Sequence, residues 1–369
     1  MGKMMTLEAK KMGFYVAAID PSPDCPSHSI SDEHIISGFG DASAIRKLAE
    51  MTDVLTYESE HINARALLEL EREGFVIYPS PESLINIQDK FVQKSILRDN
   101  GIVVGDFMAL PDCGALSAAA EAYGYPFYIK TKRDGYDGKG NALITGAAAA
   151  QKAWEEFSGK EIYAEKLVPF IKEVSVLAAR GISGEVAVYP VAENLHKRSI
   201  LFETSVPAVV SDETAARAME TAAEVMRVFK GVGMFCVEMF VLEGGGVSVN
   251  EIAPRPHNSG HYTIEACVTS QFEQHIRAIT GLPLGSTALL SPAVMRNLIG
   301  PEDWGSPSEY VYDGVGEALR LEGLSFHNYA KGRVSKARKM GHFTVLGKSV
   351  EEARKKACAA SDLIKIVPA

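Results

Sequence analysis

Short apolar runs alternate with helical patterns through the first ninety residues of the chain. The apolar runs predict strands at 14–20, 53–56 and 76–78, and the helical patterns predict helices at 1–12, 42–51 and 64–73. Strands that alternate with helices are typical of a doubly wound parallel sheet. Because no strand precedes the helix at 1–12, the pattern begins partway through a β–α–β unit, and we expect the first strand of this sheet to be missing.

The remainder of the chain mixes longer helices with strands and turns. Helices are predicted at 89–100, 147–157 and 213–230, and a strand at 126–131. In the helix at 213–230, apolar side chains recur at helical spacing and place Ala216, Met219, Ala223 and Met226 on one face. From residue 301 onward the pattern predicts short strands and turns, including a small β element at 341–346.

Composition narrows the class of protein. The chain has 369 residues, 46% hydrophobic and 23% charged, which is ordinary for a globular protein with two or three cores. No run of 18 apolar residues occurs, so no membrane span is expected. The first residues contain lysines and no apolar block, which argues against a secretory signal. Five scattered cysteines favour a reduced, cytoplasmic protein, and the net charge of −9 argues against a general nucleic-acid surface.

Two glutamates are brought together by a predicted β-hairpin. If Gly244 and Gly245 form its two-residue loop, Glu238 lies directly opposite Glu251, with Cβ atoms roughly 5 Å apart. Two bare carboxylates at that distance repel unless a proton or cation lies between them. Mg²⁺ suits the position because it binds one or two carboxylates and leaves sites for phosphate oxygens. An exposed face with one glutamate turned away is the alternative, and the neighbouring Asn250 favours the metal.

A glycine-rich loop follows a strand that ends in Lys130. Three glycines within residues 135–140 would let the backbone approach phosphates closely and present N–H groups to them. Lys130 would add a point charge for the same phosphates. The loop lacks the Gly-Lys-Ser/Thr ending of a P-loop, so a nucleotide site of another kind is predicted, with a mobile turn as the alternative.

Two further segments are open to more than one interpretation. Residues 165–168 could offer backbone groups to an adenine rim and Glu173 could bind ribose hydroxyls, but these residues alone favour an ordinary amphipathic strand with solvated charges. Residues 331–339 hold five basic side chains in nine positions. Such a run is usually a solvated patch, and a small molecule that carries a phosphate is the second interpretation.

The segment at 254–260 combines anion-binding groups with a predicted helix start. Asn258 or Ser259 could cap a helix over 262–279, whose free N–H groups attract anions. Arg255 and His257 would add donors at the same place. We therefore predict an anion pocket here; the alternative is plain capping with His257 as a surface imidazole.

These motifs together resemble one family. They run through nearly the whole chain: Asp20-Pro21, Tyr57–Glu60, Pro79–Pro81, Gln88–Lys90, Gln93-Lys94, Gly135–Gly140, Glu165-Lys166, Asn250–His261 and Arg338–His342. In this combination the chain resembles the 5-(carboxyamino)imidazole ribonucleotide synthase family of ATP-grasp ligases. The resemblance implies an α/β ATP-grasp fold with an N-terminal doubly wound domain (1–93), an ATP-grasp domain (94–280, lid about 102–165) and a small β-rich C-terminal domain (281–369).

The resemblance also implies roles at matching positions. Mg²⁺, with Mn²⁺ as the alternative ion, would be held by Glu238 and Glu251, and bicarbonate by Arg255, His257, Asn258 and Ser259. Tyr136 and Asp137 would meet the aminoimidazole, with Asp137 orienting or deprotonating its amine, and Lys331 and Arg338 would meet its ribose phosphate. The implied ATP contacts are Lys90, Lys130, Gly135, Tyr136, Asp137, Gly138, Lys139, Gly140, Asn141, Glu165, Lys166, Leu167, Val168, Glu173, His196, Asn250 and Glu251.

The activity implied is ATP-dependent carboxylation of 5-aminoimidazole ribonucleotide by bicarbonate, through carboxyphosphate, in purine biosynthesis. A cytoplasmic homodimer that passes its product to the next mutase of the pathway is expected, without nucleic-acid or membrane partners. The family opens with a strand and a Gly-Gly-Gly-Gln-Leu loop that this sequence lacks, which puts part of the ribonucleotide site in doubt. The alternatives are a formate-dependent glycinamide ribonucleotide ligase, a truncated ATP-binding protein without catalysis, and a basic nucleic-acid module.

Overall fold

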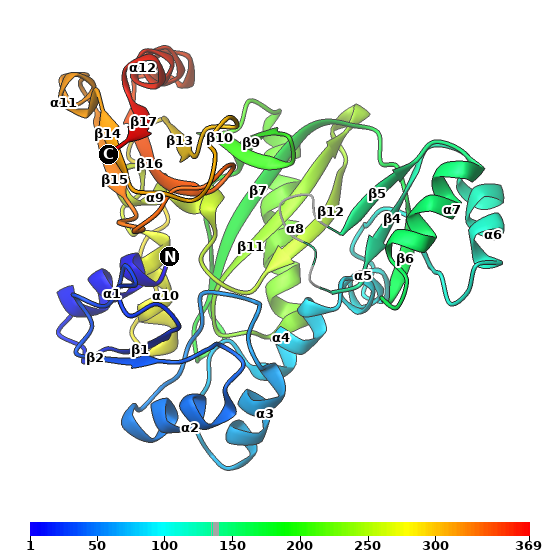
Figure 1. The fold of residues 1–369 in the computed structure, drawn as a ribbon, viewed down its shortest axis with the longest axis horizontal. Coiled ribbons are helices and arrows are strands. Elements are labelled where there is room, and N and C mark those ends of the chain that lie inside the picture. The colour runs from blue at the N-terminus through cyan, green and yellow to red at the C-terminus, as the bar shows by residue number, and fades with distance from the viewer. Residues whose placement is uncertain (134, 136–139) are drawn as a thin grey trace.

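One large sheet joins the middle of the chain to its C-terminal part. The computed structural model describes residues 1–133, 135 and 140–369. Its main sheet runs in the order β12-β11-β7-β9-β10-β13-β16-β15, with β8 paired to β7. Figure 1 shows the N-terminal elements below this sheet, a lid to its right and the C-terminal elements at upper left. The cleft described below lies where these parts approach one another.

The N-terminal part is helical around a short parallel sheet. Its elements are α1 (Gly2–Lys11), β1 (Ala17–Asp20), β2 (Glu33–Ile36), α2 (Ala42–Met51), α3 (Ala64–Arg72) and α4 (Pro81–Gln88). β1 and β2 pair in parallel, and the strands predicted at 53–56 and 76–78 are reduced to one parallel bridge between Leu55 and Ile77. β2 was not predicted because Glu33-His34-Ile35-Ile36 shows neither alternation nor a continuous apolar run.

The lid is a small antiparallel sheet covered by two helices. It contains β3 (Phe107–Ala109), α6 (Ala115–Tyr123), β4 (Phe127–Thr131), β5 (Asn141–Ile144), α7 (Ala147–Glu156) and β6 (Ile162–Lys166), with strand order β3-β6-β4-β5. Alternate residues of β4 are buried against the helices, among them Phe127 and Ile129. Lys130 therefore projects to the other face of the sheet. Helix α5 (Lys90–Asp99), capped by Asp89, connects the lid region to the N-terminal part.

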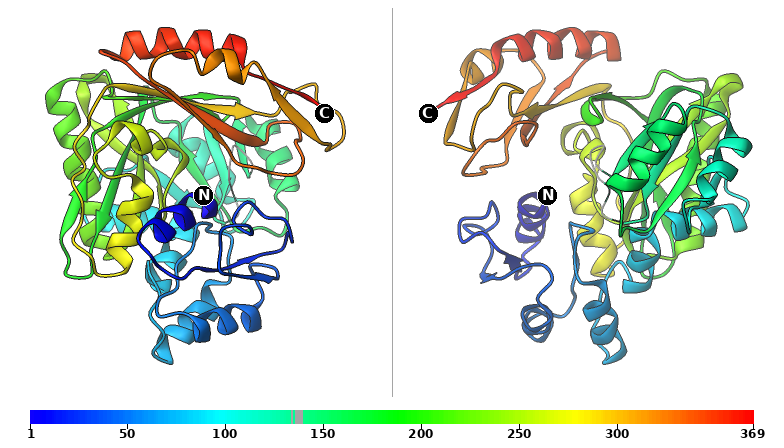
Figure 2. Two further views of the ribbon diagram at one scale, coloured as in Figure 1. Left: turned by 90° about the vertical axis from the view of Figure 1, so that its left-hand side faces the viewer. Right: turned by 45° about the vertical axis from the view of Figure 1, so that its right-hand side comes forward.

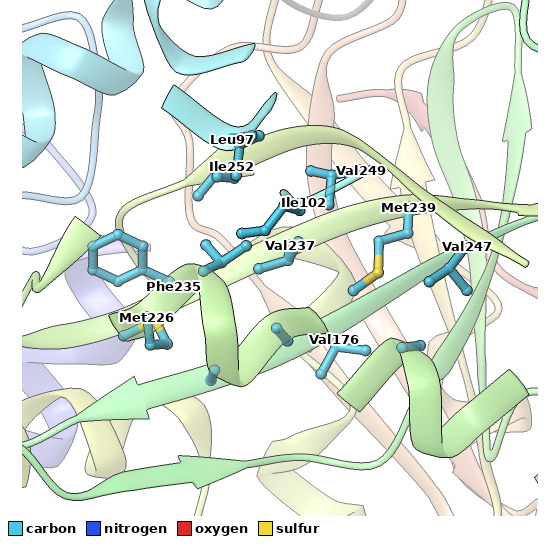
Figure 3. Close-up of a cluster of buried hydrophobic side chains, with 14 of the residues drawn as sticks. Leu97, Ile102, Val176, Met226, Phe235, Val237, Met239, Val247, Val249 and Ile252 are labelled. Carbon is cyan, nitrogen blue, oxygen red and sulfur yellow. The ribbon is translucent and has the colours of Figure 1, made fainter. Parts of the chain in front are cut away.

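The central body packs α8 (Asp212–Phe229) against the main sheet. The strands are β7 (Phe170–Arg180), β8 (Val186–Val188), β9 (Ala192–Lys197), β10 (Ile200–Val206), β11 (Gly233–Leu242) and β12 (Val247–Ala253). Figure 3 shows Met226 of α8 close to Phe235, with Leu97 and Ile102 closing the core from the far side. The predicted helix is confirmed, but Ala216 is exposed and the buried face instead carries Ala218, Ala222 and Val225.

The C-terminal part departs most from the prediction. Its elements are α9 (Thr263–Ala266), α10 (Gln271–Ile279), β13 (Ala293–Ile299), β14 (Tyr310–Asp313), α11 (Val315–Ala318), β15 (Leu324–Asn328), β16 (Lys339–Leu346), α12 (Val350–Leu363) and β17 (Lys365–Pro368). The prediction of a single helix over 262–279 is wrong. Cys267, which lies between α9 and α10, is extended and forms a β-bridge with Leu289. Helix α12 was missed, and its buried Ala353, Ala357 and Ala360 pack on the sheet face.

The N-terminal and C-terminal parts face each other across a gap in the ribbon on one side of the body (Figure 2). Among the described residues, no helix is both long enough and apolar enough to span a membrane. Apolar contacts between α1 and α10 attach the N-terminal part to the body, through Ala9 and Ile276.

Candidate functional site

A cleft of about 1510 Å³ is lined by the N-terminal part, the body, the lid and the C-terminal part together. More than half of the predicted site residues that the structure describes line it. They are Gly135, Asn141, Glu173, His196, Glu238, Asn250, Glu251, Arg255, His257, Asn258, Lys331 and Arg338. Tyr136, Asp137, Gly138 and Lys139 lie outside the described residues. The structure thus brings into one space groups that are separated by up to two hundred positions in the sequence.

The predicted pair of carboxylates is present on the β11–β12 hairpin. Glu238 and Glu251 are directly opposed partners on the two strands, and both line the cleft. Burial, and then the charge of Glu251, raises the pKa of Glu238 to about 7. Lys90 at the start of α5 reaches Glu251, with 3.0 Å between its Nζ and Oε2. The two carboxylates therefore repel each other as expected and are only partly neutralised by the protein.

The hairpin geometry that opposes Glu238 and Glu251 differs from the predicted two-residue loop. Three residues, Glu243–Gly245, form the turn, so the pairs next to it do not follow a two-residue loop. A β-bulge between Glu238 and Met239 then leaves Asn250 without an opposite partner and shifts the register by one residue. The two departures cancel, and Glu238 still faces Glu251. Bulges redirect side chains near active sites, and this one sets Asn250 into the cleft wall.

The carboxylate pair fits a divalent cation of the magnesium type. Glu238 and Glu251 supply hard oxygen ligands, and their mutual repulsion is relieved by a cation between them. Within the described residues, no cluster of three or more His, Cys, Asp or Glu side chains forms a complete metal cage. Mg²⁺ commonly binds through one or two carboxylates and takes its other ligands from phosphates and water, so this incomplete set is what a magnesium–nucleotide site requires.

Lys130 and Glu165 belong to a buried ion network between the lid and the body. Glu165 is 3% exposed, and its two carboxylate oxygens lie 3.3 Å from Nζ of Lys94 and 3.1 Å from Nζ of Lys130. Lys94 also donates to the backbone oxygen of Asn250 on β12, at 3.1 Å. The two lysines lower the pKa of Glu165 against the effect of its burial. The Glu165 carboxylate is thus bound by two lysines of the protein itself, and the three side chains together carry a net positive charge.

The segment after Glu165 connects the lid to the body. Lys166 is exposed and pairs with Asp106, with 3.4 Å between Nζ and Oδ2, whereas Leu167 is exposed and Val168 half-buried. Their side chains do not line the cleft, so an ATP contact here would use backbone groups. Further along, Glu173 on β7 pairs with His196 on β9, with 2.5 Å between Oε2 and Nδ1, and Glu173 raises the pKa of this imidazole.

The predicted anion segment divides into residues in the cleft wall and residues behind it. Arg255 contacts Oε1 of Glu60 at 3.0 Å through its Nε atom. His257 directs Nε2 toward Oε1 of Glu238, 3.7 Å away, while its Nδ1 accepts from the Ser259 backbone N–H at 3.3 Å. Burial, followed by the charge of Arg255, lowers the pKa of His257 well below its usual range. His257 is therefore neutral, with its proton on Nε2.

Neither Asn258 nor Ser259 is the expected helix cap. The helix cap is His257, because its side chain accepts the Ser259 N–H at the start of a three-residue 3₁₀ turn, Asn258–Gly260. Ser259 is fully buried, and its hydroxyl contacts Ser175 and His257 at 2.9 Å each, so it supports the imidazole and does not line the cleft. Asn258 exchanges two side-chain hydrogen bonds with Asn297. No long helix begins here, which removes the predicted anion site at a helix terminus.

The basic run near the C-terminus is split between two surfaces. Lys331 and Arg338 line the cleft, whereas Lys336 pairs with Glu302 at 3.0 Å. Burial and the charge of Arg338 lower the pKa of Lys331 to about 8. Lys339 also lines the cleft, so the positive charge of this run is divided between the cleft and the surface near Glu302.

Sequence reasoning missed Glu60 and Lys94 as members of the site. Glu60 balances the charge of Arg255, and Lys94 ties Glu165 to the strand that bears Glu251. Both belong to motifs that carried the family resemblance, but their partners lie 195 and 71 positions away, and only the tertiary fold shows which groups they meet. Gly140, with a positive φ of 76°, closes the turn beside Thr131 where the glycine-rich loop returns to β5.

Family models match three successive segments of the chain. Residues 1–88 match the ribonucleotide synthetase preATP-grasp domain, residues 95–272 the ATP-grasp domain, and residues 293–356 the phosphoribosylaminoimidazole carboxylase C-terminal domain. These segments follow the order of the three parts seen in the fold.

Similar proteins agree along nearly the whole length. N5-carboxyaminoimidazole ribonucleotide synthase of Bacillus subtilis (strain 168) is 39% identical over 352 residues, which cover 95% of this chain and 90% of that protein. Phosphoribosylaminoimidazole carboxylase of Ogataea methanolica is 38% identical, and the match covers 96% of this chain but 66% of that longer protein.

Solved structures give the same result. The N5-carboxyaminoimidazole ribonucleotide synthetase of Thermotoga maritima is 46% identical with a TM-score of 0.91, and the match covers 100% of this chain and 97% of that one. The N5-carboxyaminoimidazole synthase of Aspergillus clavatus, in complex with ADP and 5-aminoimidazole ribonucleotide, is 34% identical with a TM-score of 0.90 and coverage of 98% and 95%. The chain therefore belongs to the N5-carboxyaminoimidazole ribonucleotide synthase family, within the ATP-grasp fold.

Proposed function

We infer that this chain catalyses the ATP-dependent carboxylation of 5-aminoimidazole ribonucleotide by bicarbonate, which yields N5-carboxyaminoimidazole ribonucleotide, ADP and phosphate in purine biosynthesis. The observation that carries the inference is one cleft in which a carboxylate pair, an arginine–histidine pair and two basic side chains from residues 331–338 meet. Each group suits one reactant: ATP with its metal, bicarbonate, and a ribose phosphate. The Aspergillus clavatus relative, which holds ADP and 5-aminoimidazole ribonucleotide, supports the same assignment.

The nucleotide half of the site is proposed to lie between the lid and the β11–β12 hairpin. Lys130 and Lys94 together outnumber the one charge of Glu165, and this surplus positive charge is suited to ATP phosphates. Glu173 and the backbone of residues 165–168 are proposed to hold the nucleoside. Glu238 and Glu251 would hold Mg²⁺, which supplies charge neutralisation between the β- and γ-phosphates. Phosphoryl transfer of this kind depends mainly on positioning.

The anion half of the site is proposed at Arg255 and His257. Bicarbonate would take the guanidinium of Arg255 as its cationic partner, and the neutral His257 would donate a hydrogen bond from Nε2. This donor already points to Glu238, 3.7 Å away, so the bicarbonate would lie beside the metal-binding carboxylates. The γ-phosphate and bicarbonate would thus meet at one place, and the enclosing cleft would limit the access of water to the labile carboxyphosphate.

The third reactant is proposed to bind against the C-terminal part. Lys331 and Arg338 would bind its ribose phosphate, and the exocyclic amine would then face carboxyphosphate, or the carbon dioxide released from it. The nitrogen lone pair attacks the carboxyl carbon, the C–O bond to phosphate breaks, and the amine loses one proton. Asp137 is the proposed group for orienting or deprotonating this amine.

A comparison of substrate pairs tests the proposed function. ADP release is measured with ATP and Mg²⁺ in the presence of bicarbonate with 5-aminoimidazole ribonucleotide, or formate with glycinamide ribonucleotide. We expect ADP release and the carboxylated product with the first pair alone. ADP release with the formate pair would assign the chain to the sister activity. ATP binding by calorimetry without turnover of either pair would leave a nucleotide-binding protein.

A homodimer and transfer of the product to the mutase that follows in the pathway are further parts of this proposal. The product is a carbamate and therefore labile, which gives a direct transfer a chemical purpose. Sedimentation velocity at several concentrations, with and without the mutase, would measure both associations, and a monomer at all concentrations would contradict the first.

A further inference from the structure

Three histidines that the proposed reaction does not use form a stack of rings at the cleft wall, and two of them, His261 and His327, line the cleft. The ring centroid of His342 lies 4.6 Å from that of His261 and 4.4 Å from that of His327, with interplanar angles of 32° and 11°. His261 and His342 are almost completely buried. The His327 ring is stacked on that of His342, and the His261 ring is tilted to it. Among the described residues, neither this trio nor any other group of three or more His, Cys, Asp and Glu side chains could hold a metal ion.

One end of the stack is connected to the proposed bicarbonate site through Gln271. The fully buried Gln271 donates from Nε2 to the His257 backbone oxygen at 2.8 Å and to Nδ1 of His261 at 3.1 Å. Its Oε1 accepts from the His257 N–H at 2.9 Å. A side chain at position 260 would meet Oε1 of Gln271 at 2.5 Å, so Gly260 is needed for this approach. Gln271 therefore binds both the N–H and the carbonyl oxygen of the His257 backbone, and it also binds the His261 ring of the stack.

The other end of the stack is connected to the proposed phosphate site through Tyr329. The Tyr329 hydroxyl and Nδ1 of His342 are 3.0 Å apart. The Tyr329 ring also lies beneath Lys331, whose Nζ is 5.7 Å from the ring centroid and donates to the Lys339 backbone oxygen at 2.8 Å. Tyr329 therefore fixes the place from which Lys331 reaches into the cleft.

Two rings of the stack, His261 and His342, form an uncharged connection. Burial, followed by a neighbouring imidazole, lowers the pKa of both His261 and His342 well below the usual range, so both rings are neutral at physiological pH. At its two ends this connection is fixed by hydrogen bonds to Gln271 and Tyr329, and a displacement of either ring would leave a buried polar atom without its partner. Nε2 of His342 is buried without a hydrogen-bond partner, which lowers the free energy of unfolding.

We propose that His261, His342 and Tyr329 are positioning residues that hold His257 and Lys331 at the separation which the ribonucleotide must span to meet carboxyphosphate. The inference rests on the proposed function, and it adds a specificity element to it. The phosphate of the acceptor is held at one end of the connection and the carboxyl donor at the other. An acceptor of another length would then place its amine away from the carboxyl carbon.

The test uses two substitutions that each remove the same hydrogen bond while keeping an aromatic ring. In Tyr329→Phe and in His342→Phe, we expect the KM for 5-aminoimidazole ribonucleotide to rise about tenfold, less than the hundredfold that a displacement of about 1 Å can cause. ADP formed per product should rise as well, because carboxyphosphate would be hydrolysed before capture. The KM for ATP should stay as in the wild type, and the double variant should be no worse than either single one.

Tyr189→Phe is the matched control. It removes a buried hydrogen bond of the same length, 3.0 Å from the Tyr189 hydroxyl to the Thr269 backbone oxygen, in the body of the protein. A purely structural loss would affect this variant equally and would raise both KM values together. Equal effects in all three variants, or an unchanged KM for the ribonucleotide in Tyr329→Phe and His342→Phe, would overturn the proposal.

Hydrogen exchange separates this inference from the proposed function. Exchange of the amides in residues 329–339 needs no turnover, and it should be faster in Tyr329→Phe and His342→Phe than in Tyr189→Phe. If the wild type turns over neither substrate pair, the proposed function fails. Faster exchange in that segment would still support the connection, and unchanged exchange would reject it.

Discussion

At the scale of single residues, the site depends on charges that the protein leaves incompletely balanced. Glu238 and Glu251 face each other, and only Lys90 forms a direct ion pair with either of them among the described lysines and arginines. Burial raises the pKa of Glu238 most, and the charge of Glu251 raises it further. Two opposed carboxylates destabilise a fold unless a cation binds between them, and we therefore propose the metal site there.

Glu251→Gln keeps the shape of the side chain and removes its charge. We expect turnover to fall at least about 100-fold, since loss of the outer partners of a metal alone can cost that much. ADP release with bicarbonate and 5-aminoimidazole ribonucleotide is the measurement. Glu243→Gln, in the exposed turn of the same hairpin, should leave turnover unchanged. Wild-type turnover in Glu251→Gln would show that the metal is held elsewhere.

Lys94→Met tests the buried network between lid and body. Lys94 is 2% exposed and shares Glu165 with Lys130, so we expect a loss of about 3 kcal/mol in unfolding free energy, the lower end for breaking a buried pair. The comparison is Lys132→Met, whose pair with the exposed Glu161 should contribute less than about 1 kcal/mol. Urea unfolding of both variants gives the difference, and equal losses would contradict a special role for Lys94.

At the scale of elements, the β11–β12 hairpin shows how a correct contact can follow from an inexact turn. The turn has three residues, and the bulge at Asn250 restores the opposition of the two glutamates. The turn is also attached to α8, because Oγ1 of Thr214 donates to the Gly245 backbone oxygen at 3.1 Å. The hairpin that carries the proposed metal ligands is therefore aligned by the helix behind it.

Two alanine substitutions in this turn separate backbone strain from contact. Gly244 and Gly245 both have φ of 80°, but a Cβ at 245 would lie 2.7 Å from Oγ1 of Thr214, whereas one at 244 meets nothing within 4 Å. Gly244→Ala should cost about 1 kcal/mol through its positive φ alone. Gly245→Ala should cost more, and should lower turnover because the hairpin shifts on α8. Equal unfolding free energies for the two variants would show that the contact with α8 is unimportant.

At the scale of the whole molecule, buried polar contacts join the N-terminal part to the body. His275 on α10 accepts the Met234 N–H at Nδ1, 3.1 Å away, so its Nε2 carries the proton and faces Oγ1 of Thr56 at 2.7 Å. Burial lowers the pKa of His275 to about 3. The N-terminal wall of the cleft is therefore held by an imidazole that must stay neutral.

Acid should weaken this attachment. The unfolded chain binds a proton on His275 near pH 6.5 and the folded chain only near pH 3, so the stability it contributes is complete above pH 6.5 and is lost as the pH falls. The loss should approach about 1.4 kcal/mol per pH unit within that window. Unfolding free energies at pH 7, 6 and 5 should fall more steeply in the wild type than in His275→Gln, and parallel curves would contradict the assignment.

The sequence by itself determined the local elements and the residue types of the site. Helix α2 (Ala42–Met51) has the predicted bounds, and the ends of α5, α7 and α8 differ by one residue, because capping residues and apolar periodicity are local properties. The motifs also identified the family. The predicted opposition of Glu238 to Glu251 is present, but it depends on a three-residue turn and a bulge that the sequence did not predict. Helix α12 and strand β2 were missed because their apolar patterns are weak and their burial comes from distant partners.

Only the tertiary structure decided how those residues act together. It placed Ser259 behind His257, gave Glu165 to Lys94 and Lys130, and set Glu60 against Arg255. It also stacked His261 on His342, although 81 positions separate them in the sequence. Hydrogen bonds and ion pairs depend on distances of a few ångströms between segments that the chain order leaves unrelated. The residue types therefore determine which chemistry is available, and tertiary packing determines its geometry.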